Sequence, residues 1–323
     1  MAVYTPVSPE EAAPFLERLG LGPPEALEPV PGGIENTNYR VRTRGRWYVL
    51  TLFEREPPGR VAETLRLARE LARRGVPCPE PVQGPEGPVG RLKGRPAALV
   101  PWVEGRLVPD PDTGHLEALG RAMAAFHEAG RGVPMDRGGL HLGAALAARA
   151  REIARHLEGD DPSLARLLRD EAGAQLRVPE ELLPAGVIHG DLFLDNVLFA
   201  PDAPRVVAIL DLHMAGRGPL AYDLAVTLLD AAWEPEGVSG DRARALLRGY
   251  RSVRPLEGAE YPWIPWLLRR AALRFLCLRL ERFRLPGKAM QLGKPKNPDE
   301  FRVKLEVLRS QCARWLQPGG TTT

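Results

Sequence analysis

Two aspartates and one asparagine within residues 187–219 have side chains suited to phosphoryl transfer. Asp191 ends an HGD motif, Asn196 stands five residues later, and Asp211 follows a further apolar stretch. Transfer of a phosphoryl group to a hydroxyl needs a carboxylate that accepts or orients the hydroxyl proton, together with oxygen ligands for Mg²⁺. Mg²⁺ prefers oxygen and keeps several water and phosphate ligands beside one or two protein carboxylates. The segment therefore offers Asp191 as the base and Asn196 with Asp211 as metal ligands.

The predicted local structure brings these three side chains together. The apolar pair Val187-Ile188 follows a Pro-Gly turn and predicts a short strand, so that Asp191 emerges on a loop. The runs 197–199 and 206–210, separated by PDAP, predict a β-hairpin whose second strand ends at Asp211. Asn196 precedes the first of these strands, and we therefore expect it to converge with the two aspartates.

Short motifs recur by chance, and Asp and Asn are also ordinary turn residues. The glycines and proline at 216–219 and the helical pattern around Asp223 follow the hairpin, however, and the agreement of these contexts favours a functional site. We count Asp191 and His189 as the catalytic residues, with His189 holding the loop. Asp223 is predicted to be a buried structural acceptor.

The two motifs HGDxxxxN and DxxxxxxGPxxxDLA, at 189–196 and 211–225, resemble those of the aminoglycoside phosphotransferase and choline kinase superfamily. Within that superfamily, three segments look like the bacterial homoserine kinase of the protein-kinase-like type: PGGIENTNYRV at 31–41, RWYVLTLFE at 46–54 and HGDLFLDNVLF at 189–199. The resemblance implies transfer of phosphate from ATP, with Mg²⁺ as the metal, to the side-chain hydroxyl of L-homoserine.

The resemblance also implies an α+β, bilobal, protein-kinase-like fold. We expect an N-terminal nucleotide-binding lobe at 1–101, with an antiparallel sheet and helices, and a larger, mostly helical catalytic and substrate lobe at 102–323. A chain of 323 residues exceeds what one hydrophobic core usually supports, which agrees with two lobes. Sequence periodicity further predicts helices at about 9–19, 60–73, 116–127 and 142–157, and adjacent strands at 39–42 and 47–53.

Composition bounds the classes of partner. The formal net charge of +3 is spread over interspersed acids and bases, so no nucleic-acid partner is expected. No run of 18 apolar residues and no leader-like N-terminus occurs, and Cys78, Cys277 and Cys312 have no metal-ligand spacing. We therefore expect a cytoplasmic protein with reduced thiols and no membrane partner.

Two segments are candidates for nucleotide binding. Gly32 and Gly33 form a turn whose backbone N–H groups can approach a phosphate closely, although a Gly-Gly turn is often a plain hairpin. The resemblance adds Asn36 and Asn38 beside that turn. The strand at 97–100 leads into a hinge-like PWVEG segment, where the predicted adenine contacts are Val100, Trp102 and Val103.

One departure from the kinase pattern concerns the strand lysine that contacts the nucleotide phosphates and pairs with a helix glutamate. Thr51 occupies that slot, so that Glu63 or Glu70 lacks the expected partner, and Arg42 is one candidate for a substitute cation. The missing lysine leaves open an inactive nucleotide-binding module that regulates a partner. The presence of Asp191 argues against that alternative.

Residues 263–283 carry five arginines among apolar residues. Their spacing predicts a helix with one solvated basic face. An RNA-binding helix is the less favoured alternative.

Substrate recognition is expected to involve residues around the catalytic loop. A small zwitterion such as homoserine needs a cation or amides for its carboxylate and acids or carbonyls for its ammonium. The candidates around the loop are Asp195, His213, Arg217, Tyr222 and Asp230. Leu194 stands where homoserine kinases often have Arg, and His213-Met214 replaces an aromatic pair. A neighbouring alcohol, such as an aminoglycoside, choline or another amino alcohol, therefore remains an alternative.

Overall fold

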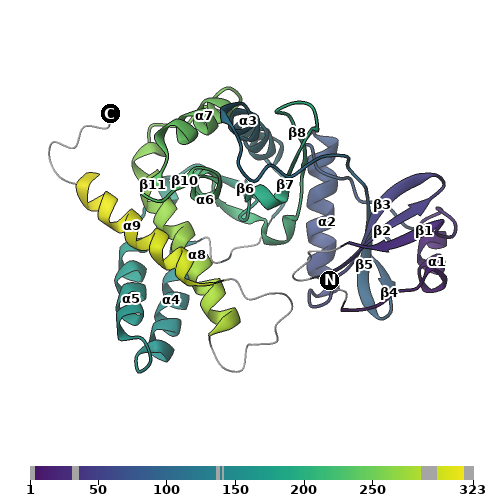
Figure 1. Ribbon diagram of the computed structural model, residues 1–323, viewed down its shortest axis with the longest axis horizontal. Helices are drawn as coiled ribbons and strands as arrows, with labels where there is room; N and C mark the ends of the chain where they lie inside the picture. Colours follow the sequence, from purple (N-terminus) through teal and green to yellow (C-terminus); the bar gives the residue numbers. More distant parts are fainter. Residues whose placement is uncertain (1–3, 31–35, 136–138, 140–141, 285–296, 316–323) are drawn as a thin grey trace.

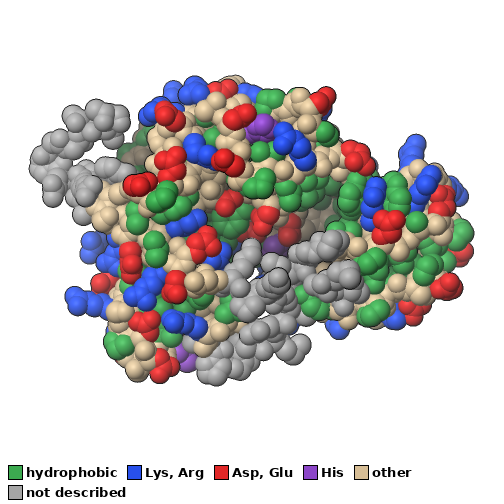
Figure 2. Space-filling model, in the orientation of Figure 1, with side chains coloured by type: hydrophobic (Ala, Val, Ile, Leu, Met, Phe, Trp, Pro, Cys, Tyr) green, Lys and Arg blue, Asp and Glu red, His purple; other side chains and the backbone are tan. Residues whose placement is uncertain are grey.

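The computed structural model of the protein describes residues 4–30, 36–135, 139, 142–284 and 297–315, and it has two parts of different architecture (Figure 1). The N-terminal part is a sheet flanked by helices, and the C-terminal part is mainly helical. The surface is hollowed between the two parts, and acidic and histidine side chains lie in the hollow (Figure 2).

The N-terminal sheet is antiparallel throughout, in the order β1-β2-β3-β5-β4. Its strands are β1 (Ala26–Pro29), β2 (Thr37–Thr43), β3 (Arg46–Leu52), β4 (Gly90–Leu92) and β5 (Arg95–Pro101). Alternate residues of β2 and β3 are buried, as their sequence pattern predicts, and they pack on Phe15 and Leu16 of α1 (Pro9–Arg18). A capping box begins α1, because Ser8 and Glu11 each accept a backbone N–H from the other.

Helix α2 (Pro58–Arg73) contributes to both parts of the molecule. Val61 and Leu65 pack with Ala98 of β5, whereas Leu67 and Leu71 belong to the core of the helical part. Because one helix is shared, the hydrophobic cores do not separate cleanly along the sequence. The division at 101/102 stays a prediction.

The helical part also contains the short strands that carry the catalytic motifs. Its α-helices are α3 (Thr113–Ala129), α4 (Gly143–Leu157), α5 (Pro162–Gln175), α6 (Leu220–Ala231), α7 (Gly240–Arg251), α8 (Ile264–Phe283) and α9 (Asp299–Trp315). Its 3₁₀ turns are η1 (Glu180–Leu182), η2 (Leu194–Asn196), η3 (Leu212–Met214) and η4 (Tyr261–Trp263). The strand pairs are β6 (Ala185–Ile188) with β9 (Gly216–Pro219), β7 (Val197–Phe199) with β8 (Val206–Ile209), and β10 (Trp233–Glu234) with β11 (Gly237–Val238).

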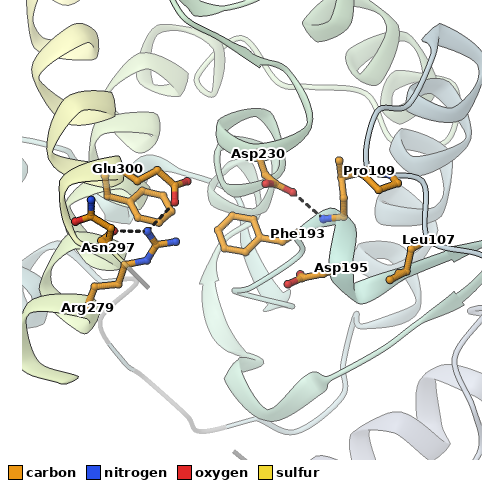
Figure 3. A pocket seen from close by; sticks show the side chains of 10 residues that line it. Leu107, Pro109, Phe193, Asp195, Asp230, Arg279, Asn297 and Glu300 are labelled. Carbon is orange, nitrogen blue, oxygen red and sulfur yellow. Dashed lines mark hydrogen bonds and ion pairs between the residues drawn. The ribbon is translucent and has the colours of Figure 1, made fainter. Parts of the chain in front are cut away.

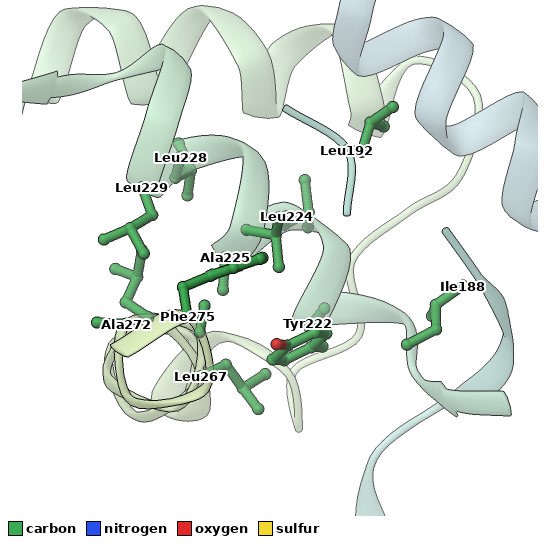
Figure 4. Close-up of a cluster of buried hydrophobic side chains, with 14 of the residues drawn as sticks. Ile188, Leu192, Tyr222, Leu224, Ala225, Leu228, Leu229, Leu267, Ala272 and Phe275 are labelled. Atoms are coloured by element: carbon green, nitrogen blue, oxygen red, sulfur yellow. The ribbon is translucent and has the colours of Figure 1, made fainter. Parts of the chain in front are cut away.

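Helix α6 forms the centre of this part. Eleven of its residues, including Leu224 and Leu228, are buried. Figure 4 shows that its side chains meet Leu267 and Phe275 of α8 on one side and Ile188 of β6 on another. A helix that is apolar on every side is buried on every side, and α6 therefore provides a fixed support for the loop that follows β6.

Helices α3 and α7 touch backbone to backbone. A Cβ atom on Gly120 would lie 2.1 Å from the carbonyl oxygen of Leu246, and one on Gly249 would lie 2.0 Å from the carbonyl oxygen of Glu117. Both distances are far below van der Waals contact, so only glycine fits at this crossing.

The solvated arginine face predicted for α8 is wrong. Arg269, Arg270 and Arg274 are buried. Arg269 forms an ion pair with Glu171 at 2.6 Å, and Arg270 forms one with Glu180 at 2.6 Å. Spacing alone cannot distinguish a solvated arginine from a buried one whose charge is compensated by another helix. The RNA-binding alternative loses its basis for these three arginines.

The other predicted elements are confirmed with shifts of a few residues at their ends, namely α1, β2, β3, α2, β5, α3, α4, β6 and the β7–β8 hairpin.

Among the described residues, no helix combines the length and apolar character that crossing a membrane requires.

Replacing Gly249 by Ala should force α3 and α7 apart and lower the free energy of unfolding by about 3 kcal/mol, the upper range for overpacking a core. Denaturant unfolding followed by circular dichroism measures this change. The matched control is Gly173→Ala in α5, where an added Cβ meets nothing within 4 Å. The control should gain about 0.5–1 kcal/mol from helix propensity. Equal unfolding midpoints for both variants would show that the α3–α7 contact is looser than in this structure.

Candidate active site

The catalytic loop is anchored by the carboxylate of Asp223 in the first turn of α6. Asp223 is fully buried and accepts the backbone N–H of His189 at 2.7 Å and that of Gly190 at 2.8 Å. The ring of His127 lies against the same carboxylate, with Nε2 to Oδ2 at 3.0 Å. Burial raises the pKa of Asp223, but the hydrogen bond and charge of His127 outweigh it and hold that pKa below its ordinary value. Asp223 is thus a buried acceptor, as expected.

His189 holds the loop through both ring nitrogens. Its Nε2–H donates to the carbonyl oxygen of Leu210 at 2.8 Å, and its Nδ1 accepts the backbone N–H of Asp191 at 3.2 Å. Nδ1 can accept a hydrogen bond only when the ring is neutral, and burial lowers the pKa of His189, which favours that state. The side chain is fully buried, so His189 can act only through the loop that it positions.

Arg274 is a further residue of the site that the sequence did not single out. Its NH1 donates to the carbonyl oxygen of Gly190, and the hydroxyl of Tyr222 lies 3.4 Å from the same nitrogen. Gly190 needs its glycine, because its φ is +76° and a Cβ would lie 2.7 Å from the carbonyl oxygen of Met214. The catalytic loop is therefore held from α6 at its N–H groups and from α8 at a carbonyl group.

Asp191 is half-buried at the start of the loop. Burial raises its pKa to about 7, against the opposing positive charges of Arg274 and His213. A carboxylate with a pKa near neutrality accepts a proton from a hydroxyl more readily than one with a pKa near 4. The environment of Asp191 thus suits a general base.

Asn196 and Asp211 provide oxygen atoms at one end of the β7–β8 hairpin. The Nδ2 group of Asn196 donates to the carbonyl oxygen of Asp191 at 2.8 Å, which leaves its Oδ1 without a partner among the described residues. The backbone carbonyl oxygen of Asn196 accepts the N–H of Leu210, the residue before Asp211. The hairpin therefore places both candidate ligands beside the loop, and an amide oxygen with a carboxylate fits a hard divalent cation.

The carboxylate of Asp211 is half exposed and hydrogen-bonds to Nδ1 of His213. Burial raises the pKa of Asp211, but the bond to His213 outweighs it and keeps that pKa below its ordinary value. Asp211 is therefore ionised at neutral pH, the state that a metal ligand needs. Its φ of 60° places it in the left-handed region, which turns the chain directly after β8.

The candidate nucleotide contacts of the sheet are only partly described. Gly32 and Gly33 lie outside the described residues. Asn38 Oδ1 accepts a hydrogen bond from Thr51 at 2.7 Å across β2 and β3, and Asn36 Oδ1 accepts the backbone N–H of Glu54 at 3.4 Å. Thr51 therefore fills the lysine slot with a neutral hydroxyl that pairs with a predicted nucleotide residue.

The hinge segment after β5 has one backbone donor in use. The N–H of Trp102 donates to the carbonyl oxygen of Trp47 at 3.0 Å, and the Trp102 ring stacks on the guanidinium of Arg40 at 4.5 Å. Val100 pairs with Val49 of β3. Val103 makes no backbone hydrogen bond within the described part of the chain, so its N–H and carbonyl groups are available for adenine.

Arg42 is not a replacement for the strand lysine in this structure. It pairs with Glu25 at 3.2 Å near the end of β2 that is opposite to Thr37. Of the two helix acids considered, Glu70 is exposed and lies 3.9 Å from Arg74, whereas Glu63 is half-buried.

A pocket of about 480 Å³ adjoins the catalytic loop and contains two of the predicted substrate residues (Figure 3). Asp195 and Asp230 line it, and Asp230 accepts the backbone N–H of Leu194 at 2.8 Å. His213 lies instead against Asp211, and Arg217 is exposed on β9. Tyr222 has no exposed surface, so a direct contact of its side chain with substrate is not compatible with this structure. Arg279 and Glu300 also line the pocket, and the sequence did not indicate either of them as a site residue.

Known proteins resemble this chain over most of its length. Residues 26–256 match the model of the phosphotransferase enzyme family. The chain is 41% identical to a homoserine kinase from Methylobacterium radiotolerans over 321 residues, covering 96% of both chains. It is 40% identical to a homoserine kinase from Xanthobacter autotrophicus over 313 residues, covering 94% of this chain and 95% of the other.

Solved structures resemble the fold over nearly the whole chain. An aminoglycoside phosphotransferase from Alicyclobacillus acidocaldarius has a TM-score of 0.63 at 19% identity, covering 96% of this chain and 97% of its own. An amicoumacin kinase in complex with AMP-PNP, Ca²⁺ and Ami has a TM-score of 0.67 at 17% identity, covering 92% and 91%. The α+β, protein-kinase-like fold expected from the sequence is thereby confirmed.

In the protein without nucleotide, the carboxyl group of Asp191 should titrate near pH 7, since burial raises its pKa to about 7. It is protonated below that pH and ionised above it. A ¹³C NMR titration of protein labelled at the aspartate carboxyl carbons measures the midpoint, and the resonance missing in Asp191→Asn gives the assignment. A midpoint near the ordinary value of about 4 would contradict the burial described for this side chain.

Proposed function

The chain belongs to the phosphotransferase enzyme family, and from this premise we propose that it phosphorylates the side-chain hydroxyl of L-homoserine at the expense of ATP. The observation that carries the proposal is the catalytic loop. Gly190, the residue before Asp191, is anchored from α6 and α8, and Asp191 itself is bound by Asn196 and lies within electrostatic reach of Asp211. The choice of homoserine rests on the identity of about 40% with homoserine kinases over both parts of the chain.

In the proposed reaction Asp191 orients the hydroxyl of the acceptor and receives its proton. The hydroxyl oxygen forms a bond to the γ-phosphorus as the bond between that phosphorus and the β,γ-bridging oxygen breaks. The products are O-phosphohomoserine and ADP, and the proton passes from Asp191 to water. We propose that this product serves threonine synthesis in the cytoplasm.

We propose Mg²⁺ as the metal, held by Oδ1 of Asn196 and the carboxylate of Asp211. Both are hard oxygen ligands, and the remaining positions are left for phosphate and water, as Mg²⁺ prefers. When bound, the metal neutralises charge on the phosphates. Asp211 is suited to this task because the hydrogen bond from His213 favours its ionised form.

The nucleotide is proposed to bind between the sheet and the catalytic loop. Val100 and Asn38 lie on the half-buried face of the sheet, and the unpaired backbone groups of Val103 suit the adenine edge. Gly32 and Gly33, with Asn36, are proposed to cover the phosphates. The neutral Thr51 contributes no charge, and we propose that Mg²⁺ and the glycine turn offset the charge of the phosphates.

Two rival functions make different predictions. A kinase of an aminoglycoside or of choline would act on a cation without a carboxylate, whereas Arg279 adds a positive charge to the pocket beside the loop. An inactive regulatory module would bind ATP and transfer no phosphate. The presence of Asp191 with both candidate metal ligands supports an active enzyme.

A coupled ADP-release assay with Mg-ATP should show turnover that is strongly selective for L-homoserine over choline, an aminoglycoside and L-serine. The selectivity is expected because the pocket holds both acids and a cation. Turnover of another alcohol alone would retain the catalytic residues and discard the substrate. ATP binding with no turnover of any acceptor would favour the regulatory module.

Replacing Asp191 by Asn should lower kcat by about two orders of magnitude or more, the usual contribution of a general base. The amide cannot accept the proton, although it has nearly the same shape. Asp202→Asn is the matched control, since Asp202 is exposed in the hairpin turn and should leave kcat unchanged. Full activity in Asp191→Asn would remove the proposed base from the mechanism.

A further inference from the structure

The pocket beside the catalytic loop has an aromatic wall that joins the loop to the two last helices. The ring centroid of Phe193 lies 4.6 Å from that of Phe275 in α8, and the Phe275 ring stacks on Phe301 of α9 at 5.2 Å. The rings of Phe275 and Phe301 are stacked, and those of Phe193 and Phe275 are tilted by 42°; close contacts between aromatic rings at such separations are favourable. The loop that carries Asp191 is therefore fixed relative to side chains of α8 and α9 that face the same pocket.

A positive group stands at one side of this wall. The guanidinium of Arg279 packs over Phe301 at 4.3 Å, and its NH1 donates to Glu300 at 2.7 Å and to the carbonyl oxygen of Asn297 at 2.7 Å. Its Nε and NH2 groups have no partner among the described residues. Figure 3 shows the guanidinium turned towards the pocket, with Asp195 and Asp230 across Phe193 from it.

The negative charge of Glu300 is already compensated. Its Oε2 accepts from Arg279, and its Oε1 lies 3.2 Å from Nζ of Lys304. Burial raises the pKa of Glu300, but Arg279 and Lys304 together hold it below its ordinary value. Glu300 therefore fixes the guanidinium in place, and the free N–H groups of Arg279 suit an anion from the ligand.

A negative group stands at the opposite side. Asp230 accepts the N–H of Leu194 through Oδ2, while its Oδ1 has no partner among the described residues. Asp195 is exposed on the same rim. The pocket thus presents a donor pair and an acceptor that are separated by an apolar ring.

We propose that this pocket recognises the two charged groups of an α-amino acid acceptor, with Arg279 binding its carboxylate and Asp230 binding its ammonium group. The inference rests on the proposed function and names the residues that give it specificity. An acceptor held in this way lies beside the loop that begins at Asp191. Cationic alcohols without a carboxylate are disfavoured, because they offer no anion to the free N–H groups of Arg279.

The test compares three acceptors that differ by one charged group each: L-homoserine, 3-aminopropan-1-ol without the carboxylate, and 4-hydroxybutanoate without the ammonium. The wild-type enzyme should lose about tenfold or more in kcat/KM for each group removed, as expected for a charge-assisted contact. Arg279→Met should lower kcat/KM for homoserine to the value for 3-aminopropan-1-ol and leave the latter unchanged. Asp230→Asn keeps an oxygen for the Leu194 N–H. It should lower kcat/KM for homoserine to the value for 4-hydroxybutanoate and leave kcat/KM for 4-hydroxybutanoate unchanged.

Arg302→Met is the matched control, because Arg302 follows Phe301 on α9 but bonds to Asp161 and Ser163 away from the pocket. The KM for ATP and the melting temperature should be equal in all variants, since Lys304 still compensates Glu300 in Arg279→Met. If Arg279→Met lost kcat/KM equally for all three acceptors, the inference would be overturned. Homoserine turnover by the wild type would still support the proposed function in that case. Absence of homoserine turnover in the wild type would overturn both.

Discussion

The catalytic geometry depends on one buried carboxylate. Both oxygens of Asp223 accept N–H groups from the turn at His189 and Gly190. Burying an ionised carboxylate costs desolvation free energy, and hydrogen bonds of this kind offset that cost. His127 of α3 donates to this carboxylate, and the hydroxyl of Tyr250 of α7 lies 2.8 Å from the other ring nitrogen of His127. Arg254 donates to that hydroxyl and to Glu260, which extends the hydrogen-bond network. The close crossing of α3 and α7 is what brings these polar groups into line.

Helix α8 is the second support, and its arginines show how burial changes the role of a charge. Arg269 and Arg270 join α8 to residues 171–180 through compensated ion pairs, whereas Arg274 reaches the carbonyl oxygen of Gly190. Each of these groups would be costly to bury without its partner. The same helix then presents Arg279 to the pocket. One helix therefore connects the position of the catalytic loop to the position of the acceptor pocket.

The sheet contributes to the site in a less charged way than the kinase pattern requires. The hydroxyl of Thr51 donates to Oδ1 of Asn38. Arg40 lies between Trp47 and Trp102, where its guanidinium is held over both rings at 4.0 and 4.5 Å. This cation beside the hinge is thus used for packing. Helix α2 links this sheet to the core of the helical part, which ties the nucleotide side of the hollow to the catalytic side.

The sequence by itself determined the motifs and the local elements. The HGD loop, the hairpin that ends before Asp211 and most helices follow from turn residues and apolar periodicity, which act over a few residues. Tertiary structure decided which charges are buried. Arg274, Arg279 and Tyr222 could not be placed from the sequence, because the partners that bury or expose them lie on elements distant in the chain. Residue spacing predicts which side chains share one face of a helix, whereas tertiary packing determines whether that face contacts solvent or another element.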